Sequence, residues 1–244
     1  MELTLPTHRT GAKSQVCSDC PSRLANIFCP LEGKSVQRIN AAKISHLFKK
    51  KQTLFTEGNP AVGLYCIQSG RVKGYKTSPE GKQYIIRLFE PGDVVGLPAI
   101  FIEGSYSWSA EVVEEGAICF IPREPILETI RENPKMATKI METLAEHLEE
   151  ANTERAQLAY GAVRERMARL LSLLSQTHGV KAGRGTRIAL KLSREELAEM
   201  IGTAAETAIR LLSEFKEEKI LEMEGKEIII LKSDNLLKTA GLAD

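Results

Sequence analysis

The sequence predicts an α+β protein with a β-rich N-terminal half, a long helix and a helical C-terminal half that ends in a winged helix-turn-helix. Short β-rich runs cut by glycines fill residues 53–121, a pattern typical of a sandwich or barrel. Apolar residues at alternating steps of four and three follow in residues 126–158, which indicates a long helix. Two short helical patterns around Gly202 and a final hairpin pattern indicate the helix-turn-helix and its wing.

The composition indicates a soluble protein of two domains that works in the cytoplasm. The 244 residues are 43% hydrophobic and 27% charged, which is ordinary for globular domains. No apolar run reaches the roughly 18–20 residues of a membrane span, and the polar N-terminus lacks the apolar stretch of a secretory signal. We therefore expect no membrane association, and we expect the five cysteines to be reduced thiols or metal ligands rather than disulfides.

Changes of pattern divide the chain into four parts. The first holds a tail without periodicity and then the cysteine segment, which runs from Cys17 to Cys29. The parts are residues 1–35 (tail and cysteine segment), 36–125 (β domain), 126–158 (long helix) and 159–244 (helix-turn-helix domain).

The long helix carries an apolar seam at heptad spacing. The seam positions are Ala137, Met141, Leu144, Leu148, Ala151, Arg155 and Leu158. Such a seam is typical of a helix that pairs with a second copy. Packing on the chain's own β domain is the alternative, but one small β domain covers less apolar stripe than this helix presents. The charge of Arg155 lowers dimer stability, so this residue is a candidate for setting the equilibrium between monomer and dimer near balance.

The helix-turn-helix is predicted from capping and turn residues. Ser193 and Glu196 form an S-x-x-E capping box that begins one helix. Gly202 lies in the turn, and a second helix is expected from about Ala204 to Glu218. Two apolar runs in residues 220–231 are separated by a short Gly-containing turn and predict a hairpin, the wing.

Glu206 and Arg210 are candidate DNA-reading residues on the second helix. They are four residues apart, so they project from one face. Arg bonds bidentately to guanine, and Glu accepts from cytosine N4, so the pair can read adjacent base pairs in the major groove. A solvated Glu-Arg helix pair, or a capping role for Glu206 after Thr203, is the alternative from spacing alone.

Three stretches of the sequence resemble segments of a known protein family. They are LFTEGNPAVGLYCIQSGRVKGY, FEPGDVVG and ETAIRLLSEF. The first two are similar to the β-roll of cyclic-nucleotide-binding-type domains, and the third to the recognition helix of the Crp/Fnr family of bacterial transcription regulators. The resemblance covers about residues 45–232 in the order β-roll, dimer helix, winged helix-turn-helix. It implies a homodimer that binds a two-fold symmetric site on double-stranded DNA and contacts RNA polymerase.

The resemblance also implies roles for particular residues of the helix-turn-helix. It assigns Glu206 and Arg210 to the shared base pairs of each half-site. It places Ser193 and Arg194 near the phosphate backbone. Ala204 stands where relatives have Ser or Thr, and Thr203, one residue earlier, is a candidate replacement for that phosphate contact. Ile209 replaces a residue that is often polar, so the outer bases of the site are open.

Two positions of the β domain argue against cyclic AMP as the ligand. A bound cyclic nucleotide needs a cation for its phosphate and an acceptor for its ribose hydroxyl. Leu97 and Trp108 stand about where the cyclic AMP branch of the family has an acidic residue and an Arg. We therefore do not expect cyclic AMP binding.

Four cysteines resemble the ligand set of the oxygen-sensing Fnr branch. Cys17, Cys20 and Cys29 form C-x2-C-x8-C ahead of the β domain, and Cys119 lies on its last strand, in AICFIP. In that branch three N-terminal cysteines and one on this strand hold a [4Fe–4S] cluster, and four thiolates suit such a cluster. The gap between Cys20 and Cys29 is longer than in the best-known members. Cys66 reads as a small buried hydrophobe.

Other interpretations of the cysteines remain open. They could hold zinc or form a redox-sensing thiol pair, and Cys119 could be a buried core residue. A [4Fe–4S] cluster would fix how the β domain packs on the long helix. Oxygen or nitric oxide would destroy the cluster and thereby loosen the dimer seam. A haem- or nitric-oxide-sensing regulator is a further alternative, with His46 and His147 available, although neither has a partner at ligand spacing.

Functions of other classes leave part of the sequence unexplained. A redox enzyme or electron carrier would not need the winged helix-turn-helix, and no dinucleotide motif, Ser-His-Asp set or catalytic carboxylate pair stands out. A plain interaction module would not need it either. We therefore expect a regulator and not an enzyme. Target genes, and activation as against repression, do not follow from the sequence.

Overall fold

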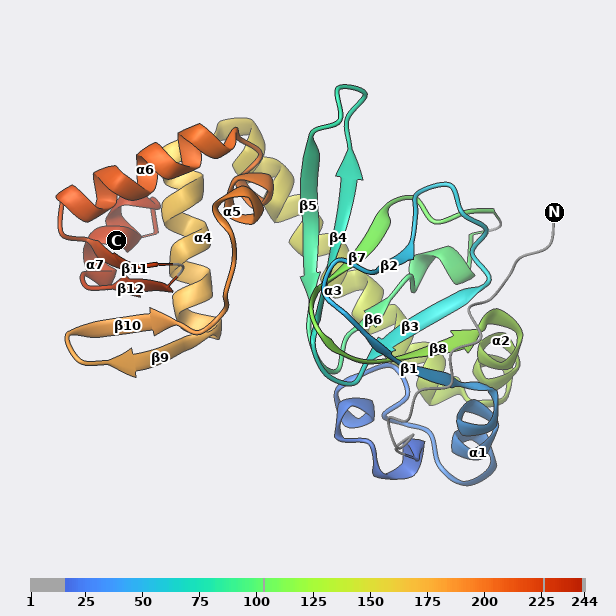
Figure 1. The fold of residues 1–244 in the computed structure, drawn as a ribbon. Helices are drawn as coiled ribbons and strands as arrows, with labels where there is room; N and C mark the ends of the chain where they lie inside the picture. The colour runs from blue at the N-terminus through green and yellow to red at the C-terminus, as the bar shows by residue number, and fades with distance from the viewer. Residues whose placement is uncertain (1–15, 103, 226, 243–244) are drawn as a thin grey trace. The chain divides into compact units, whose positions relative to one another are not determined.

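The computed structural model describes residues 16–102, 104–225 and 227–242, without the side chains of residues 154 and 157–160. It divides into two compact units (Figure 1). The first unit contains residues 16–76 and 86–148, and the second contains residues 77–85 and 149–242. The helix α3 therefore has residues in both units. No helix among the described residues combines the length and apolarity needed to cross a membrane.

Two four-stranded sheets form the β domain, which belongs to the first unit except for the end of β4 and the start of β5. The first has the order β1-β8-β3-β6 and the second β2-β7-β4-β5. The strands are β1 (Ile44–Phe48), β2 (Thr53–Phe55), β3 (Gly63–Ile67), β4 (Arg71–Thr77), β5 (Gln83–Phe89), β6 (Val94–Val95), β7 (Ser109–Glu114) and β8 (Gly116–Pro122). Apolar residues of both sheets, among them Phe55, Val72 and Ile118, are buried together, as expected for sheets packed face to face.

Helices cover the other side of the first sheet. They are the short 3₁₀ helices η1 (Cys17–Asp19) and η2 (Pro21–Ala25), then α1 (Gly33–Ala42), α2 (Arg123–Glu132) and α3 (Pro134–Tyr160), while η3 (Pro98–Ile100) follows β6. A second apolar core joins Leu64 of β3 and Ile121 of β8 to Ile39 of α1, Ile126 of α2 and Ile140 of α3. The first sheet therefore has a buried core on each of its faces.

The segment predicted as one helix over residues 126–158 contains two helices. α2 ends at Glu132, and α3 begins at Pro134. Proline lacks the N–H that a continuous helix needs and disfavours a helical residue before it, but it suits the first turn of a helix. Asn133 caps the new helix, since its side-chain oxygen accepts from the Met136 N–H at 3.1 Å.

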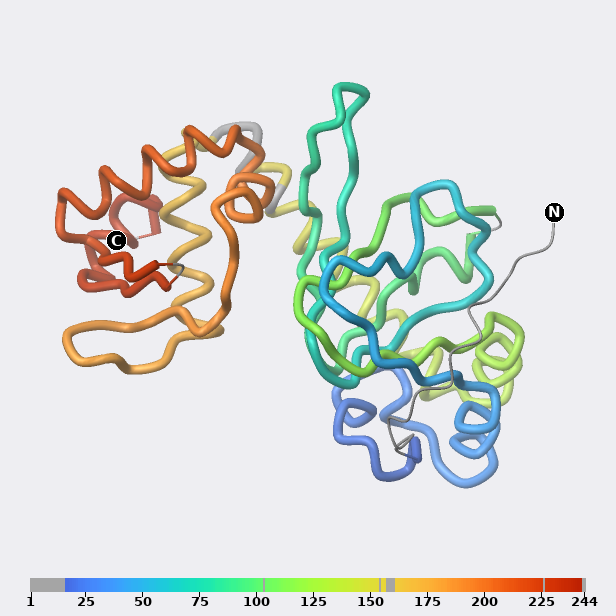
Figure 2. The backbone as a smooth tube through the Cα atoms, in the orientation of Figure 1, coloured from blue at the N-terminus to red at the C-terminus, as the bar shows by residue number. Residues whose placement is uncertain are grey.

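The second unit contains the helix-turn-helix and a four-stranded sheet (Figure 2). Its elements after α3 are α4 (Val163–Thr177), β9 (Gly179–Ala182), β10 (Gly185–Ile188), α5 (Arg194–Ile201), α6 (Ala205–Glu217), β11 (Leu221–Glu224), β12 (Glu227–Ile230) and α7 (Ser233–Thr239). The predicted wing is the β11–β12 hairpin, in sheet order β11-β12-β10-β9. The basic stretch at residues 181–186 forms much of the β9–β10 hairpin, with Gly183 at φ +51° in its turn.

Candidate nucleic-acid interface and cysteine cavity

The first helix of the helix-turn-helix begins at the predicted capping box. The Ser193 hydroxyl accepts from the Glu196 N–H at 3.1 Å, and the Glu196 carboxylate accepts from the Ser193 N–H at 2.6 Å. Both bonds give a partner to a backbone N–H that would otherwise lack one at the start of a helix. Glu196 is buried, so the box is a fixed part of the domain.

The turn between the two helices is set by Gly202. Its φ of +64° is left-handed, which Gly adopts without a Cβ clash. The Thr203 N–H donates to the Ala198 carbonyl at 3.0 Å, and α6 then begins at Ala205. The N-cap residue of α6 is Ala204, so Thr203 and Glu206 do not form a second capping box.

The second helix, α6, presents the predicted reading residues on its exposed face. Its buried face packs into the domain through Ala208, Leu211, Leu212 and Phe215. Glu206, Ile209 and Arg210 are exposed, with 69% of the Arg210 side chain accessible. Arg210 contacts Glu214 at 3.4 Å rather than Glu206. The pair is therefore not locked together, and both ends can reach an external ligand.

Arginines of α4 hold the helix-turn-helix in position. Arg164 donates to Glu214 at 3.0 Å and to Glu218 at 2.6 Å, and its guanidinium lies 4.6 Å from the Phe215 ring centroid. Arg166 donates to the Ile201 carbonyl at the end of α5, at 2.9 Å. Such charge-assisted bonds are stronger than neutral ones, so they stabilise the position of α6 in the domain. The sequence pattern did not single out either arginine.

Arg194 connects α5 to the wing. Its Nη2 donates to the Gly225 carbonyl at 3.2 Å and contacts the Met223 sulfur at 3.4 Å. Its Nη1 is buried with no hydrogen-bond partner among the described residues, and burial lowers the pKa of the guanidinium. The side chain that the resemblance places near phosphate thus lies against the wing in this structure.

The strands β3 and β8 bring two cysteines onto one face of the first sheet. Cys66 lies directly opposite Cys119 in the antiparallel register. Alternation along the strands places Leu64 and Ile121 on that same face, and both belong to the helix-covered core. The Ser45 hydroxyl on the neighbouring strand β1 lies 3.2 Å from the Cys119 sulfur. The sheet therefore offers adjacent thiols to the helices that cover it.

The cysteine segment is anchored against this face by polar contacts. The Cys17 N–H donates to the Asn40 side chain on α1 at 2.9 Å. The Ser22 hydroxyl donates to the Gln68 carbonyl after β3 at 3.2 Å. A Cβ on Gly92 would lie 3.0 Å from the Cβ of Ala25, so the absence of a side chain there permits the close approach. The segment is docked although its only helices are 3₁₀ turns.

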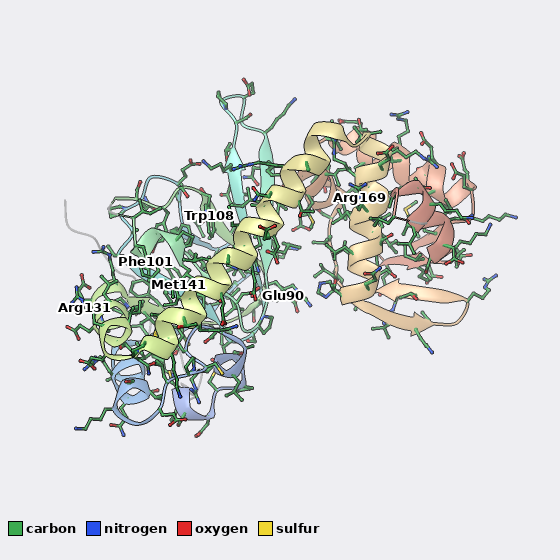
Figure 3. The ribbon with its side chains drawn as sticks, turned by 180° about the vertical axis from the view of Figure 1, so that it is seen from behind. Glu90, Phe101, Trp108, Arg131, Met141 and Arg169 are labelled. Atoms are coloured by element: carbon green, nitrogen blue, oxygen red, sulfur yellow. The ribbon has the colours of Figure 1, made fainter. Side chains whose placement is uncertain are left out.

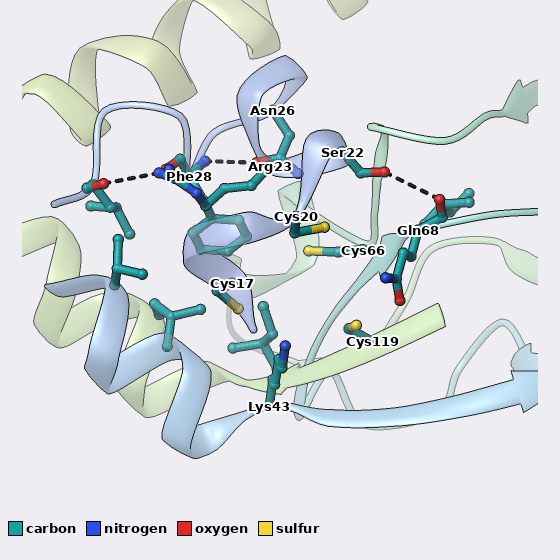
Figure 4. Close-up of a pocket in the computed structure, with 15 residues that line it drawn as sticks. Cys17, Cys20, Ser22, Arg23, Asn26, Phe28, Lys43, Cys66, Gln68 and Cys119 are labelled. Carbon is teal, nitrogen blue, oxygen red and sulfur yellow. Dashed lines mark hydrogen bonds between the residues drawn. The ribbon is translucent and has the colours of Figure 1, made fainter. Parts of the chain in front are cut away.

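A cavity of about 40 Å³ separates the segment from the sheet. This volume exceeds the roughly 10–15 Å³ that one water needs. Four thiols line it, and Figure 4 shows their sulfur atoms around the same space. These are Cys17, Cys20, Cys66 and Cys119. We call it the cysteine cavity; its wall also includes Phe28, Arg23 and Lys43.

The electrostatic surroundings of two of these thiols favour the neutral form in the absence of metal. Burial raises the pKa of the Cys17 thiol, against the opposing effect of the nearby Lys43 ammonium. Burial, and then the neighbouring thiols, raise the pKa of Cys66 well above its ordinary value. The Nε of Arg23, another wall residue, is buried without a hydrogen-bond partner in the described chain. The cavity therefore has cationic groups beside sulfur.

Cys29 lies outside the cysteine cavity. Its side chain is exposed and is absent from the cavity wall. Of the four cysteines in the predicted ligand set, the structure thus brings together Cys17, Cys20 and Cys119. Cys66 joins them, although the sequence pattern favoured a core role for it. Within the described residues no three His, Cys, Asp or Glu side chains are grouped closely enough to hold a single metal ion.

The residues that replace a nucleotide cassette are packed into the β domain. Leu97 is fully buried in the helix-covered core. Trp108 stacks on Phe89, with ring centroids 5.5 Å apart and planes 13° from parallel, and lies 5.2 Å from Phe55. Neither side chain supplies a cation for the phosphate or a carboxylate for the ribose hydroxyl. His46, on β1, has its ring 6.1 Å from that of Phe48, and neither it nor His147 lines the cysteine cavity.

The predicted seam on α3 is exposed over much of its length. Met141 (Figure 3) and Leu148 are 62% and 60% exposed. Ala151 and Arg155 are exposed too, while Ala137 is half-buried. Leu144 packs partly against the core that contains Met136 and Ile140. The side chain of Leu158 lies outside the described residues.

Comparisons with known proteins agree on both domains. A model of the cyclic nucleotide-binding domain matches residues 45–133, and one of the Crp-like helix-turn-helix domain matches residues 165–239. The CRP-like cAMP-activated global transcriptional regulator of Mycobacterium tuberculosis is 29% identical over 216 residues, 88% of this chain and 96% of that protein. The fumarate and nitrate reduction regulatory protein of Vibrio cholerae is 28% identical over 236 residues, 96% and 94% of the two chains.

A solved structure supports the fold. The c-di-GMP responsive global regulator CLP of Xanthomonas campestris is 23% identical and superposes with a TM-score of 0.74 over 82% of this chain and 99% of that one. Both domain models match in the order that the two units follow, and relatives of nearly full length are transcription regulators. The chain therefore belongs to the Crp/Fnr family of DNA-binding transcription regulators.

Proposed function

We propose that the chain is a homodimeric regulator that binds an inverted-repeat DNA site under the control of an oxygen- or nitric-oxide-labile [4Fe–4S] cluster. The observation that carries the proposal is the cysteine cavity, in which Cys17, Cys20 and Cys119 meet beside the core of the first unit. We propose these three thiols as cluster ligands. The resemblance implies Cys29 as the fourth.

The donor set of the cavity fits such a cluster. Thiolates are the usual protein ligands of [4Fe–4S] clusters. A cluster with four thiolates carries net negative charge, so the Lys43 ammonium and the unpartnered Arg23 Nε on the cavity wall favour it. When bound, the cluster supplies a centre that oxygen or nitric oxide can destroy. The Ser45 hydroxyl is placed to donate to the Cys119 sulfur, and hydrogen bonds to sulfur tune cluster potentials.

The proposal of a cluster rather than zinc rests on the resemblance to the Fnr branch. In a cluster each thiolate binds a different iron, and four thiols line the cysteine cavity. Zinc bound by cysteine thiolates is the alternative, and metal analysis of the purified chain distinguishes the two.

The core of the first unit provides a route from the cysteines to the dimer seam. Phe28, near the end of the cysteine segment, and Leu31, just after it, share one core with Met136 and Ile140 of α3. A bound cluster would hold the segment in place and thereby fix the packing beneath α3. The seam residue Met141, next to Ile140 on α3, is exposed, and we propose that a second copy covers it. Loss of the cluster would loosen the segment and weaken the dimer, with Arg155 tuning the balance.

DNA binding is proposed to use the exposed face of α6. Glu206 and Arg210 read base pairs, and Ile209 is placed on the same face to contact base edges. Thr203, Ser193 and Arg194 are proposed to lie near the phosphates, and the dimer would contact RNA polymerase. Cyclic AMP is not proposed as a ligand, because the cassette positions carry packed apolar side chains.

Anaerobic purification with iron and sulfide analysis tests the proposal most directly. We expect about four irons and four sulfides per chain with a broad visible absorbance, a dimer by sedimentation, and tight binding to an inverted-repeat duplex. Air should bleach the absorbance and lower both dimerisation and DNA affinity. A chain without iron and sulfide would contradict cluster control. If air destroys the cluster but leaves dimerisation unchanged, the proposed coupling between cluster and dimer is contradicted.

A further inference from the structure

We infer that Cys66, and not Cys29, supplies the fourth thiolate at the cysteine cavity, an assignment that rests on the proposed cluster. The first support is register, because Cys66 on β3 lies directly opposite Cys119 on β8. Opposite residues in an antiparallel pair have Cβ atoms about 4.5–5.5 Å apart on the same face of the sheet. A cluster bound at Cys119 therefore has the Cys66 thiol beside it, on a rigid strand.

The second support is the place of Cys66 in the cavity wall. Its side chain shares the helix-covered face with Leu64 and lines the cavity with Cys17, Cys20 and Cys119 (Figure 4).

The third support is that Cys29 is held facing away by the turn that contains it. Its N–H donates to the Asn26 carbonyl at 2.9 Å, and its carbonyl accepts from Arg23 Nη1 at 3.3 Å. The same Nη1 lies within bonding distance of the Phe28 and Leu31 carbonyls, at 3.1 and 2.9 Å. Phe28 and Leu31 are both buried. Turning Cys29 inward would break these bonds and withdraw both side chains from the core.

A substitution series in the full-length chain tests the assignment. Wild type, Cys66→Ala, Cys29→Ala and Cys119→Ala are reconstituted anaerobically and their iron and sulfide counted. We expect about four irons per chain in wild type and in Cys29→Ala, and three or fewer, with a changed visible spectrum, in Cys66→Ala and Cys119→Ala. Four irons in Cys66→Ala, or fewer than wild type in Cys29→Ala, would overturn the assignment.

Thiol labelling of the wild type gives an independent answer. A maleimide added anaerobically to the cluster-loaded chain should modify Cys29 fully without release of iron. Release of iron on modification, or protection of Cys29 that ends when iron is chelated, would overturn the assignment. This measurement needs no substitution, so it holds even if circular dichroism shows that Cys66→Ala is misfolded. If the wild type binds no iron, the proposed function itself is wrong. If the wild type and Cys66→Ala both bind a full cluster, only the assignment of Cys66 is wrong.

Discussion

The helix α6 and the cysteine cavity hold their candidate functional side chains in contrasting ways. Glu206 and Arg210 lie exposed on α6, a helix of thirteen residues whose other face is buried in the second unit. The thiols of the cysteine cavity lie between a rigid sheet and the cysteine segment, whose only helices are the 3₁₀ helices η1 and η2. The two candidate base-reading residues lie on a single packed helix, whereas the thiols of the cavity come from distant parts of the chain.

This difference indicates where each region can change. Side chains that project from a well-packed helix can meet a ligand without refolding, so α6 is suited to reading a fixed sequence of bases. A short segment with few regular backbone hydrogen bonds opens at lower free energy than a packed helix. The cysteine segment is therefore the part of the first unit best suited to respond to a signal.

The largest effect is expected from a matched pair of core truncations. Phe215→Ala removes a fully buried ring from α6 and should lower the free energy of unfolding of the second unit by about 3–5 kcal/mol, with loss of DNA binding. Phe28→Ala removes a buried ring from the cysteine segment. It should release that segment and its iron while the β domain stays folded. Urea denaturation followed by circular dichroism measures the first effect, and iron content measures the second.

The opposite result would break the comparison between the two regions. If Phe28→Ala unfolded the whole first unit in one step, the cysteine segment would be an integral part of the fold rather than a separately opening cover. If Phe215→Ala left DNA affinity unchanged, α6 would not depend on its buried face for its position.

The next largest effect concerns the exposed seam on α3. Met141→Glu combined with Leu148→Glu should weaken the dimer at least about a hundredfold, because each apolar side chain contributes about 1.5–3 kcal/mol when buried. Folding of the single chain should change little, since both residues are more than half exposed. Sedimentation velocity measures the dimer. Leu173→Glu is the matched control, because Leu173 is 56% exposed on α4; equal effects of both changes would reject the seam as the interface.

Arg210 should control base preference rather than folding. Arg210→Ala should lose about 1–3 kcal/mol per half-site, or roughly 5- to 150-fold in affinity, with loss of discrimination at the guanine it reads. Arg210→Lys keeps the charge but not the bidentate fork, so it should keep non-specific binding and lose the same discrimination. Fluorescence anisotropy with consensus and substituted duplexes measures both. Unchanged base preference in Arg210→Ala would assign the reading to other residues.

The two regions also differ in how far the sequence predicts them. The capping box at Ser193, the turn at Gly202 and the second helix after it are predicted and are confirmed, because their signals act within a few residues. The break at Asn133–Pro134 does not follow from the apolar pattern, which continues across it, although the residue before a proline is a regular helix boundary.

The membership of the cysteine cavity could not be predicted in the same way. Which thiol faces Cys119 depends on the register between β3 and β8, and register is a long-range property. The sequence does contain a period-two signal. Leu64 and Cys66 are two residues apart on one strand and therefore share a face of the sheet, and the same holds for Cys119 and Ile121. That signal places Cys66 on a face but does not say that the cysteine segment covers the same face.

The smallest expected effect is a pH dependence confined to the first unit, which contains all five cysteines. Burial raises the pKa of Cys17 and Cys66 in the folded, metal-free chain. Below the ordinary thiol pKa of about 8.5 both states are protonated. Above it only the unfolded thiols ionise, so the free energy of unfolding should fall by up to about 1.4 kcal/mol per pH unit and thiol. Urea denaturation between pH 7 and 9 should show a shallower fall in Cys66→Ala than in the wild type, because the substitution removes one of the two buried thiols. An equal fall in the second unit would show that the thiols are not its cause.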